Sequence, residues 1–243
     1  MASTPAPGPP WLVLPTYNEA GNVEPLVAAV LDKLPGDARV LIVDDNSPDG
    51  TGQIADRLAE EHERLEVLHR PRKEGLGPAY IAGFHAALEG GAGLVLEMDS
   101  DFSHDPAYLP RLLDGAAKAD LVIGSRYVPG GGVSDWSATR RAISRGGSAY
   151  ARIVLGLRVR DLTGGFKCFR REVLEAIELD SIQSRGYAFQ VETTYRAIRA
   201  GYRVVEVPIV FRDRRVGTSK MDGAIVAEAA LRVPLLRLRA DRP

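Results

Sequence analysis

Asp99 and Asp101, one residue apart, are the side chains in this 243-residue chain whose type and spacing most directly suggest chemistry. They follow a short apolar run, 94–98, that is typical of a buried β-strand. Alternate residues of a strand point the same way, so both carboxylates face one site if the extended geometry persists to Asp101. Neighbouring carboxylates repel each other, and Mg²⁺ or Mn²⁺ is commonly held by one or two carboxylates plus substrate phosphates. The pair therefore suggests a divalent-cation site that carries a diphosphate; the alternative is a solvated acidic turn.

The elements that would position this pair alternate between strand and helix. Apolar runs predict strands at 11–14, 40–43, 65–68, 94–98 and 121–123. Helical patterns follow them: up to 34, over 52–62, after 78 to 88, and over 106–117 with Asp105 as the cap. This alternation indicates an α/β fold with a mostly parallel central sheet flanked by helices.

Three polar loops leave the carboxyl ends of these strands, at 15–19, 44–51 and 99–105. Open parallel sheets bind ligands beyond the carboxyl ends of their strands. We therefore expect the three loops to meet at one edge of the sheet.

The second half of the chain is less regular. A basic amphipathic helix is predicted over 140–157, weakened in its middle by Gly146 and Gly147. A loop at 161–167 and a helix at 187–200 follow. Strand-like segments are predicted at 203–207 and 209–211, where Pro208 indicates an edge or a bulge, and a helix at 222–233.

Composition excludes several classes of protein. A formal net charge of −1 does not support a general nucleic-acid binder. Cys168 is the single cysteine, so no disulfide forms within the chain, and we expect it to be a buried small residue. Residues 1–10 suggest a disordered lead-in rather than a signal peptide. No apolar run reaches the roughly 18–20 residues that span a bilayer, so we expect a soluble protein or one on a membrane surface.

Seven motifs in order carry a family resemblance: PTYNE at 15–19, VDDNSPDGT at 43–51, MDSD at 98–101, GSRY at 124–127, DLTGGF at 161–166, FQVE at 189–192 and SK at 219–220. Together they resemble family-2 inverting glycosyltransferases of the polyprenol-phosphate (dolichol-phosphate) mannose synthase type. The resemblance implies a single-domain GT-A nucleotide-sugar transferase fold over 11–221, followed by an amphipathic helix and basic tail at 222–243. It also implies metal-dependent transfer of mannose from GDP-mannose to polyprenyl phosphate, giving polyprenyl phosphate β-mannose.

On the donor side, the resemblance implies a Mg²⁺ or Mn²⁺ site at Asp99 and Asp101, with backbone contacts from Ser100. Ser103 stands where some members carry Gln, so either its hydroxyl is a ligand or water fills the gap. His104 is expected to be a hydrogen-bonding loop residue, because hard metals favour oxygen. The residues implied for the nucleoside are Pro15, Tyr17, Glu19, Val43 and Asp45.

Other residues of these loops are expected to shape turns and caps instead, namely Asn18, Asp44, Ser47, Pro48, Asp49 and Gly50. Two residues of a late basic loop, Arg214 and Lys220, are implied to close over the donor diphosphate. Gln190 is a candidate contact to the sugar.

On the acceptor side, the resemblance implies that Arg126, Arg140 and Ser144 hold the acceptor phosphate. Asp161 is expected either to orient an arginine or to make internal hydrogen bonds. A phosphate monoester is mostly dianionic near pH 7, so the acceptor needs no general base. Catalysis is therefore expected of Asp101, Arg126 and Arg140, which offset charge on the two reacting groups.

The lipid acceptor requires contact with a membrane, and the expected location is cytoplasmic, peripheral on the cytoplasmic face. The segment 225–238 with its arginines suggests an interfacial helix; a helix packed on the domain with a basic tail is the alternative, as is a membrane-embedded partner subunit. Rival functions are the same reaction with UDP-glucose or another sugar nucleotide, and a non-catalytic sugar-nucleotide-binding subunit. A phosphatase-like Asp-x-Asp nucleophile is disfavoured because the expected Thr is Ser103.

Overall fold

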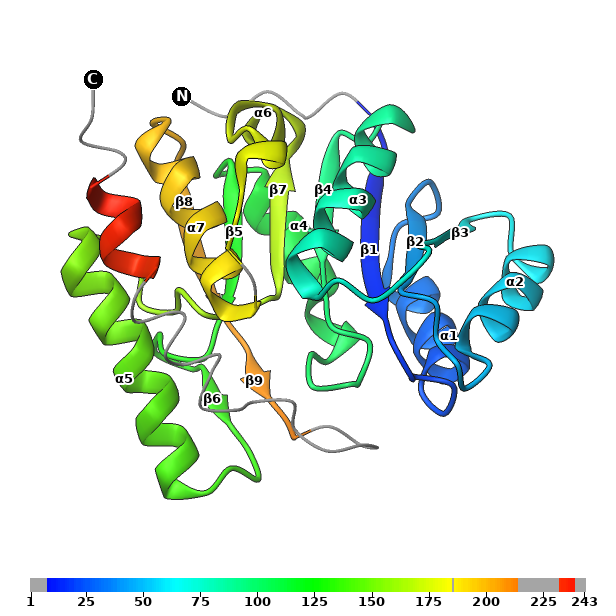
Figure 1. Ribbon diagram of the computed structural model, residues 1–243, viewed down its shortest axis with the longest axis horizontal. Helices are drawn as coiled ribbons and strands as arrows, with labels where there is room; N and C mark the ends of the chain where they lie inside the picture. Colours follow the sequence, from blue (N-terminus) through cyan, green and yellow to red (C-terminus); the bar gives the residue numbers. More distant parts are fainter. Residues whose placement is uncertain (1–7, 185, 214–231, 239–243) are drawn as a thin grey trace.

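The computed structural model describes residues 8–184, 186–213 and 232–238. Its centre is a sheet whose described strands follow the order β3-β2-β1-β4-β7-β5-β8 (Figure 1). Neighbouring strands are parallel, except that β7 runs antiparallel to both β4 and β5. The strands are β1 (Pro10–Thr16), β2 (Arg39–Asp44), β3 (Leu65–His69), β4 (Leu94–Glu97), β5 (Leu121–Ser125), β7 (Lys167–Arg170) and β8 (Val204–Pro208).

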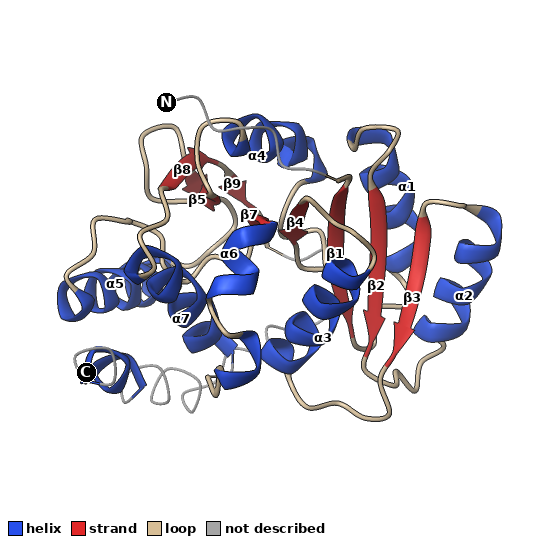
Figure 2. Cartoon of the chain, turned by 90° about the horizontal axis from the view of Figure 1, so that it is seen from above, coloured by secondary structure: helices blue, strands red, loops and turns tan. Residues whose placement is uncertain are grey.

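Helices cover both faces of this sheet. Figure 2 shows α1 and α4 on one side and α3 and α7 on the other. The short strands β6 (Gly132–Val133) and β9 (Val210–Phe211) form a separate parallel pair. The helices are α1 (Val23–Lys33), α2 (Thr51–Glu61), α3 (Leu76–Glu89), α4 (Leu109–Ala116), α5 (Ala138–Leu155), α6 (Arg171–Ala176) and α7 (Gly186–Arg199), with 3₁₀ turns η1 (Pro106–Tyr108) and η2 (Leu179–Ser181).

The core lies on both faces because side chains of a strand alternate. In β1, Trp11 and Val13 join the apolar cluster that contains α3 and α7. Leu12 and Leu14 join the cluster that contains α1 and α4. Parallel strands buried on both faces are near-continuous apolar runs, which explains why the runs were recognisable in the sequence.

The predicted α/β architecture is confirmed, including all five strands of the first half and the helices between them. Asp105 caps the helical segment after β4 as predicted, accepting a hydrogen bond from the backbone N–H of Ala107 at 3.0 Å. Pro208 ends β8, which is an edge strand of the described sheet, as its lack of an N–H requires.

Other expectations need correction. The loop predicted at 161–167 ends one residue early, because Lys167 opens β7, and neither β7 nor α6 was predicted. A four-residue strand between two others has too little sequence for its period to be recognised. Helix α5 includes Gly146 and Gly147, so the weakening predicted there does not end the helix. Pro10, expected in a disordered lead-in, opens β1.

The C-terminal helix predicted at 222–233 lies mostly outside the described residues. Residues 232–238 are helical. Val233 and Leu236 in that segment are buried in the same cluster as α7. This part of the chain therefore packs on the domain.

Candidate active site

The Asp-x-Asp loop leaves β4 at the carboxyl edge of the sheet. The strand ends at Glu97 and the backbone bends at Ser100 and Asp101, so the extended geometry does not persist to Asp101. Phe102 has a φ of 62°, which turns the chain sharply. Asp101 accepts a hydrogen bond from the backbone N–H of Ser103 at 3.0 Å. A local turn, not strand alternation, orients this carboxylate.

Ser100 joins this loop to the end of β1. Its hydroxyl donates to the carbonyl of Pro15 at 2.8 Å, and Ser100 is buried. Strands β1 and β2 also end level, with Thr16 opposite Asp44. The three polar loops therefore meet at one edge of the sheet, as predicted from the alternating strands and helices.

His104 stabilises the Asp-x-Asp loop by a hydrogen bond to its backbone. The backbone N–H of Asp99 donates to its Nδ1 at 3.2 Å, and its ring stacks on Phe166 with centroids 4.9 Å apart. Burial lowers the pKa of His104 to about 4, and the nearby Arg126 charge adds to that effect. A neutral imidazole that accepts a hydrogen bond confirms the predicted loop role.

The residues around Asp99 and Asp101 fit a hard cation that also binds a ligand. The side chain of Asp99 is 33% exposed. The Oγ atom of Ser103 is buried and has no hydrogen-bond partner among the described residues. Within that part of the chain, no three His, Cys, Asp or Glu side chains cluster into a metal site. Proteins nonetheless commonly bind Mg²⁺ with one or two carboxylates when substrate phosphates supply the remaining ligands.

Polar turns shape the neighbouring loop after β2. Asp44 accepts hydrogen bonds from the hydroxyl and backbone N–H of Ser47, at 2.5 and 3.1 Å. Asp49 accepts from Thr51 in the same way, and Gly50 adopts a φ of 92° before α2. Asn18 has a φ of 58°, which agrees with a role in loop geometry. These observations match the turn and cap roles predicted for this group.

The residues predicted to hold the nucleoside lie on these same loops. Pro15 and Val43 are paired in the register of β1 and β2. The ring of Tyr17 lies 3.9 Å from the Lys73 ammonium. Glu19 accepts a hydrogen bond from Asn22 at 2.8 Å, so it helps to open α1.

Asp45 is buried and receives a hydrogen bond from Nη1 of Arg70. Burial raises the pKa of Asp45, and the Arg70 charge offsets only part of that increase. The Asp45 carboxylate, although it binds one arginine, can still accept a hydrogen bond from a ligand hydroxyl.

A buried carboxylate orients Arg126, which follows β5. Nε and Nη2 of Arg126 donate to the two oxygens of Asp161 at 2.7 and 2.6 Å, and its backbone N–H donates at 2.9 Å. Nη2 also donates to Thr163 at 2.9 Å. Burial alone would raise the pKa of Asp161, but the Arg126 charge and hydrogen bonds outweigh it and hold the pKa below its usual value. Of the two roles proposed for Asp161, the structure shows the orientation of an arginine.

Aromatic rings surround the two arginines. The guanidinium of Arg126 lies 5.8 Å from the ring centroid of Trp136 and 5.5 Å from that of Phe211. The Arg140 guanidinium stacks on Trp136 at 4.2 Å and donates to Asp213 at 2.9 Å. Trp136 thus links a buried arginine to a partly exposed one.

Ser144 lies one turn after Arg140 on α5. It accepts a hydrogen bond from the hydroxyl of Tyr127 at 2.6 Å, so Tyr127 ties the loop after β5 to this helix. Trp136 and Tyr127 were not singled out from the sequence, because isolated aromatic residues in loops carry no spacing signal.

The Asp-x-Asp loop and the arginines share one side of the molecule. The ring of His104 is 5.1 Å from that of Phe211, and Phe211 is 5.2 Å from Trp136, which carries Arg140. The backbone N–H of Arg212 donates to the carbonyl of Ser103 at 3.1 Å. Strand β9 therefore bridges the two groups of predicted site residues.

Gln190, the candidate sugar contact, is buried on α7 behind Asp99. A Cβ atom added to Gly165 would lie 3.1 Å from its Nε2 and 3.8 Å from Oδ1 of Asp99, so a side chain there would crowd the Gln190 amide. Lys167 donates to Oε1 of Gln190 at 2.5 Å and lies 3.5 Å from Glu97. Burial lowers the pKa of Lys167, while the Glu97 charge acts in the opposite direction. This ion pair was not predicted and fixes one end of the Gln190 amide.

Two further side chains lie near Asp99 and Gln190. Tyr80, on α3, donates to Oδ1 of Asp99 at 3.4 Å and was not predicted. Glu192, two residues after Gln190 on α7, pairs with Arg196 at 2.5 Å. Arg214 and Lys220 lie outside the described residues.

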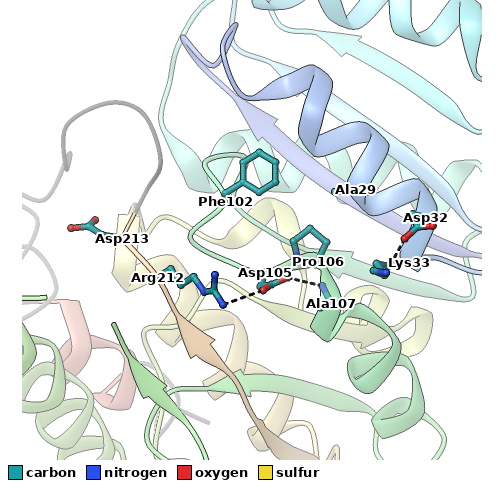
Figure 3. Close-up of a pocket in the computed structure, with 9 residues that line it drawn as sticks. All are labelled: Ala29, Asp32, Lys33, Phe102, Asp105, Pro106, Ala107, Arg212 and Asp213. Carbon is teal, nitrogen blue, oxygen red and sulfur yellow. Dashed lines mark hydrogen bonds and ion pairs between the residues drawn. The ribbon is translucent and has the colours of Figure 1, made fainter. Parts of the chain in front are cut away.

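A cavity of about 200 Å³ borders the Asp-x-Asp loop on its outer side (Figure 3). Phe102 and Asp105 line it together with the end of α1, and the Arg212 side chain points to Asp105, 3.9 Å away. It contains none of the predicted site residues.

Residues 11–178 match the family described as glycosyl transferase family 2. The chain belongs to glycosyl transferase family 2. An undecaprenyl-phosphate mannosyltransferase of Micrococcus luteus is 51% identical over 221 residues, which are 91% of this chain and 90% of the relative. A polyprenol monophosphomannose synthase of Mycolicibacterium smegmatis is 48% identical over 235 residues, covering 95% and 88% of the two chains. The family predicted from the ordered motifs is confirmed.

Solved structures with a similar fold support the predicted architecture. Glucosyl-3-phosphoglycerate synthase from Mycobacterium tuberculosis, in complex with Mn²⁺, UDP and glucosyl-3-phosphoglycerate, matches with a TM-score of 0.71. The match is 20% identical and covers 95% of this chain and 80% of that one. The same synthase with Mg²⁺ and UDP matches with a TM-score of 0.70 and 20% identity, over 95% and 79% of the two chains. At this identity the likeness shows the fold, which is GT-A. Across the described parts of this family-2 chain, we find no helix of the length and apolarity that crossing a bilayer requires.

Proposed function

We propose that this chain transfers mannose from GDP-mannose to a polyprenyl phosphate, with inversion at the anomeric carbon, and uses Mg²⁺ or Mn²⁺. The names of its two mannosyltransferase relatives, at 51% and 48% identity, support the sugar and the acceptor class. The observation that carries the proposal is the shared edge of the Asp-x-Asp loop and the arginines, joined through Phe211 and Trp136.

The donor half of the site consists of the loops after β1, β2 and β4. Asp99 and Asp101, with the unpartnered Oγ of Ser103, would hold the cation. When bound, the cation would neutralise the diphosphate and stabilise its departure. Tyr17, Glu19 and Asp45 would hold the nucleoside, and Gln190 would face the sugar. Arg214 and Lys220 would close over the diphosphate.

The acceptor half consists of the loop after β5, α5 and the segment around β9. Arg140 and Ser144 would bind the acceptor phosphate, and Arg140 offers a planar fork that is already stacked on Trp136. Arg126 donates with Nε and Nη2 to Asp161 and Thr163, so Nη1 is the part of its guanidinium left for a ligand. These cations would offset the charge of the phosphate as it approaches the anomeric carbon.

No protein nucleophile or general base is required in this reaction, because the acceptor is already an anion. His104 agrees with that account: its pKa is lowered to about 4 and its Nδ1 already accepts a hydrogen bond. A direct displacement breaks the bond between the anomeric carbon and the diphosphate and forms one to the acceptor phosphate.

A direct assay tests the proposal. Purified protein is incubated with polyprenyl phosphate, Mg²⁺ or Mn²⁺, and radiolabelled GDP-mannose or UDP-glucose, and the lipid fraction is counted. Label in lipid from GDP-mannose alone is expected. Label in lipid from UDP-glucose alone would show that the chain catalyses the same reaction with glucose instead of mannose. Label from neither donor would favour a non-catalytic subunit.

We also propose a peripheral location on the cytoplasmic face of a membrane, because the acceptor is a lipid and a single cysteine, which forms no disulfide within the chain, agrees with a reducing compartment. A membrane-embedded partner subunit is the alternative route of attachment. Fractionation of cells that express only this chain separates the two: recovery with membranes that lack other subunits supports direct contact.

A further inference from the structure

Polar atoms without a partner lie together beside Trp136 in the acceptor half. Trp136 is 8% exposed, and its indole Nε1 is buried with no hydrogen-bond partner among the described residues. The same holds for the Nε atom of Arg140, whose guanidinium lies 4.2 Å from the centre of the Trp136 ring. The two unpartnered N–H groups therefore belong to stacked side chains. Buried donors that bind nothing are few in native proteins, because each one lowers the stability of the fold.

An unpartnered indole N–H is not sufficient evidence of a binding site, because Trp11 has one as well. Trp11 lies in β1, inside the apolar cluster that contains α3 and α7. The arginine beside it, Arg39, is already paired with Glu66 at 3.1 Å. Trp136 belongs to neither of the two apolar clusters, and the arginine stacked on it has an unpartnered donor too. The surroundings of Trp136 are therefore those of a ligand site, whereas the surroundings of Trp11 are those of a core.

Two guanidinium groups approach the Trp136 ring, and each is held by a carboxylate at a different edge. Asp213 accepts from Nη1 of Arg140 at 2.9 Å. Asp161 accepts from Nε and Nη2 of Arg126, whose guanidinium lies 5.8 Å from the Trp136 ring centroid. Within the described part of the chain, Nε of Arg140 and Nη1 of Arg126 thus keep no carboxylate. These atoms and the indole N–H are donors that a ligand can use.

A phosphate monoester fits these donors. Indole and guanidinium N–H bonds lie in the planes of their groups, so the edges of two stacked groups can point at one ligand. A phosphate offers three strong acceptor oxygens, and guanidinium groups bind such oxygens in pairs. One phosphate can therefore accept from Nε of Arg140 and from Nε1 of Trp136 at the same time.

We infer that Trp136 is a further acceptor-binding residue, whose indole N–H donates to the phosphate that Arg140 binds. The ring has a second effect, because it covers one face of the Arg140 guanidinium and so fixes the plane in which that fork binds oxygen. The inference rests on the proposed function in taking the ligand to be the phosphate of the lipid acceptor. Binding of the sugar nucleotide should not depend on Trp136.

Tryptophan fluorescence tests the contact directly, because the chain has two tryptophans. A short, water-soluble polyprenyl phosphate analogue is titrated into the unchanged protein, Trp11→Phe and Trp136→Phe. The emission should change saturably in the unchanged protein and in Trp11→Phe, where Trp136 is the single reporter, and should stay constant in Trp136→Phe. Constant emission from Trp11→Phe at concentrations where calorimetry shows binding would overturn the inference. No calorimetric binding of the analogue to the unchanged protein would overturn it as well.

Calorimetry also measures how much the indole N–H contributes. Trp136→Phe keeps an aromatic face for Arg140 but removes the donor, so the Kd of the analogue should rise by about tenfold, as the loss of one hydrogen bond to a charged group implies. Trp136→Leu removes the aromatic face too and should raise this Kd further. The Kd of GDP-mannose should be unchanged in both variants. An unchanged Kd of the analogue in Trp136→Phe would contradict the inference, and an equal loss of affinity for both substrates would assign Trp136 a structural role instead.

The same proteins separate this inference from the proposed function. If the analogue changes the emission of Trp136 but receives no mannose, the proposed function fails and the contact with Trp136 stands. If mannose is transferred and Trp136→Phe has an unchanged KM for the analogue, the proposed function stands and the inference fails. Thermal unfolding checks that Trp136→Phe is folded. If it is not, the titration of Trp11→Phe decides, because that protein keeps Trp136.

Discussion

The donor half and the acceptor half hold their polar residues by different means. In the donor half, short turns orient the side chains: Asp101 accepts from Ser103, two residues on, and Asp49 accepts from Thr51. In the acceptor half, the decisive contacts join distant segments: Arg126 to Asp161, and Arg140 to Asp213, 73 residues away.

The order of strands explains this difference. Around the donor half, β3, β2 and β1 are consecutive in the chain and adjacent in the sheet. Around the acceptor half, β7 is inserted antiparallel between β4 and β5. Short turns therefore orient several donor residues, with the Ser100–Pro15 and Arg70–Asp45 contacts joining more distant segments, whereas the arginines of the acceptor half depend on packing between segments far apart. Variants that separate local from long-range effects can test this comparison.

The largest effect is expected at the centre of the donor half. Asp101→Asn removes a charge that the cation requires, so transfer should fall by about 10³-fold or more, as expected when several kcal/mol of metal stabilisation is lost. Unfolding should change little. EDTA should abolish the activity of the unchanged protein, and excess Mg²⁺ or Mn²⁺ should restore it. Near-normal transfer by Asp101→Asn would contradict the role of this carboxylate.

The next largest effect belongs to the acceptor half and concerns stability. Asp161→Asn leaves the buried Arg126 charge unpaired, which should lower the free energy of unfolding by about 3–5 kcal/mol. Urea denaturation measures it. Glu24→Gln is the control, because it breaks the exposed Arg57–Glu24 pair and should leave the free energy of unfolding nearly unchanged. Equal effects of the two variants would remove the distinction drawn between buried and exposed pairs.

Arg140→Ala should act on the acceptor alone. Loss of a charged hydrogen bond to phosphate should raise the KM for a soluble acceptor analogue or lower kcat by about 10- to 100-fold, with donor affinity unchanged. Arg141→Ala, an exposed neighbour, is the matched control and should have almost no effect on the soluble acceptor. Loss of donor affinity in Arg140→Ala would show that this arginine belongs to the other half.

Asp45→Asn should act on the donor alone. Weaker acceptance of a nucleoside hydrogen bond should raise the donor KM by about tenfold, while the acceptor KM stays constant. Asp49→Asn distinguishes a ligand from a turn residue: it should lower stability by about 1 kcal/mol and leave the donor KM unchanged. A donor effect at Asp49 and none at Asp45 would reverse these assignments.

Ser103→Ala should have the smallest effect. If its buried hydroxyl is a ligand, water must take its place, and the Mg²⁺ concentration for half-maximal activity should rise by about threefold. An unchanged metal requirement would mean that water already occupies that position in the unchanged protein.

Much of the donor half could be predicted from the sequence because its signals are local. Apolar runs identified β1 to β5, and turn residues between them identified the loops at their carboxyl ends. Asp105 was recognised as a cap and His104 as a loop residue from their neighbours alone. The extended geometry considered for Asp101 is wrong, since a bend and not a strand directs this carboxylate.

The acceptor half was harder because its partners have no fixed spacing. Arg126, Arg140 and Asp161 were named from motifs that resemble a family, yet the sequence contained nothing to indicate Trp136 between the two arginines. The Glu97–Lys167 pair was also missed, because a charged residue in a short strand is indistinguishable from one in a loop.

The amino-acid sequence by itself determined the alternation of strands and helices, the edge where the polar loops meet, and the family, because periodicity and ordered motifs are properties of the linear chain. Tertiary structure decided which arginine is buried against a carboxylate and which is partly exposed on an aromatic ring. Such choices depend on contacts between segments that are distant in the chain, and those contacts exist only once the chain has folded.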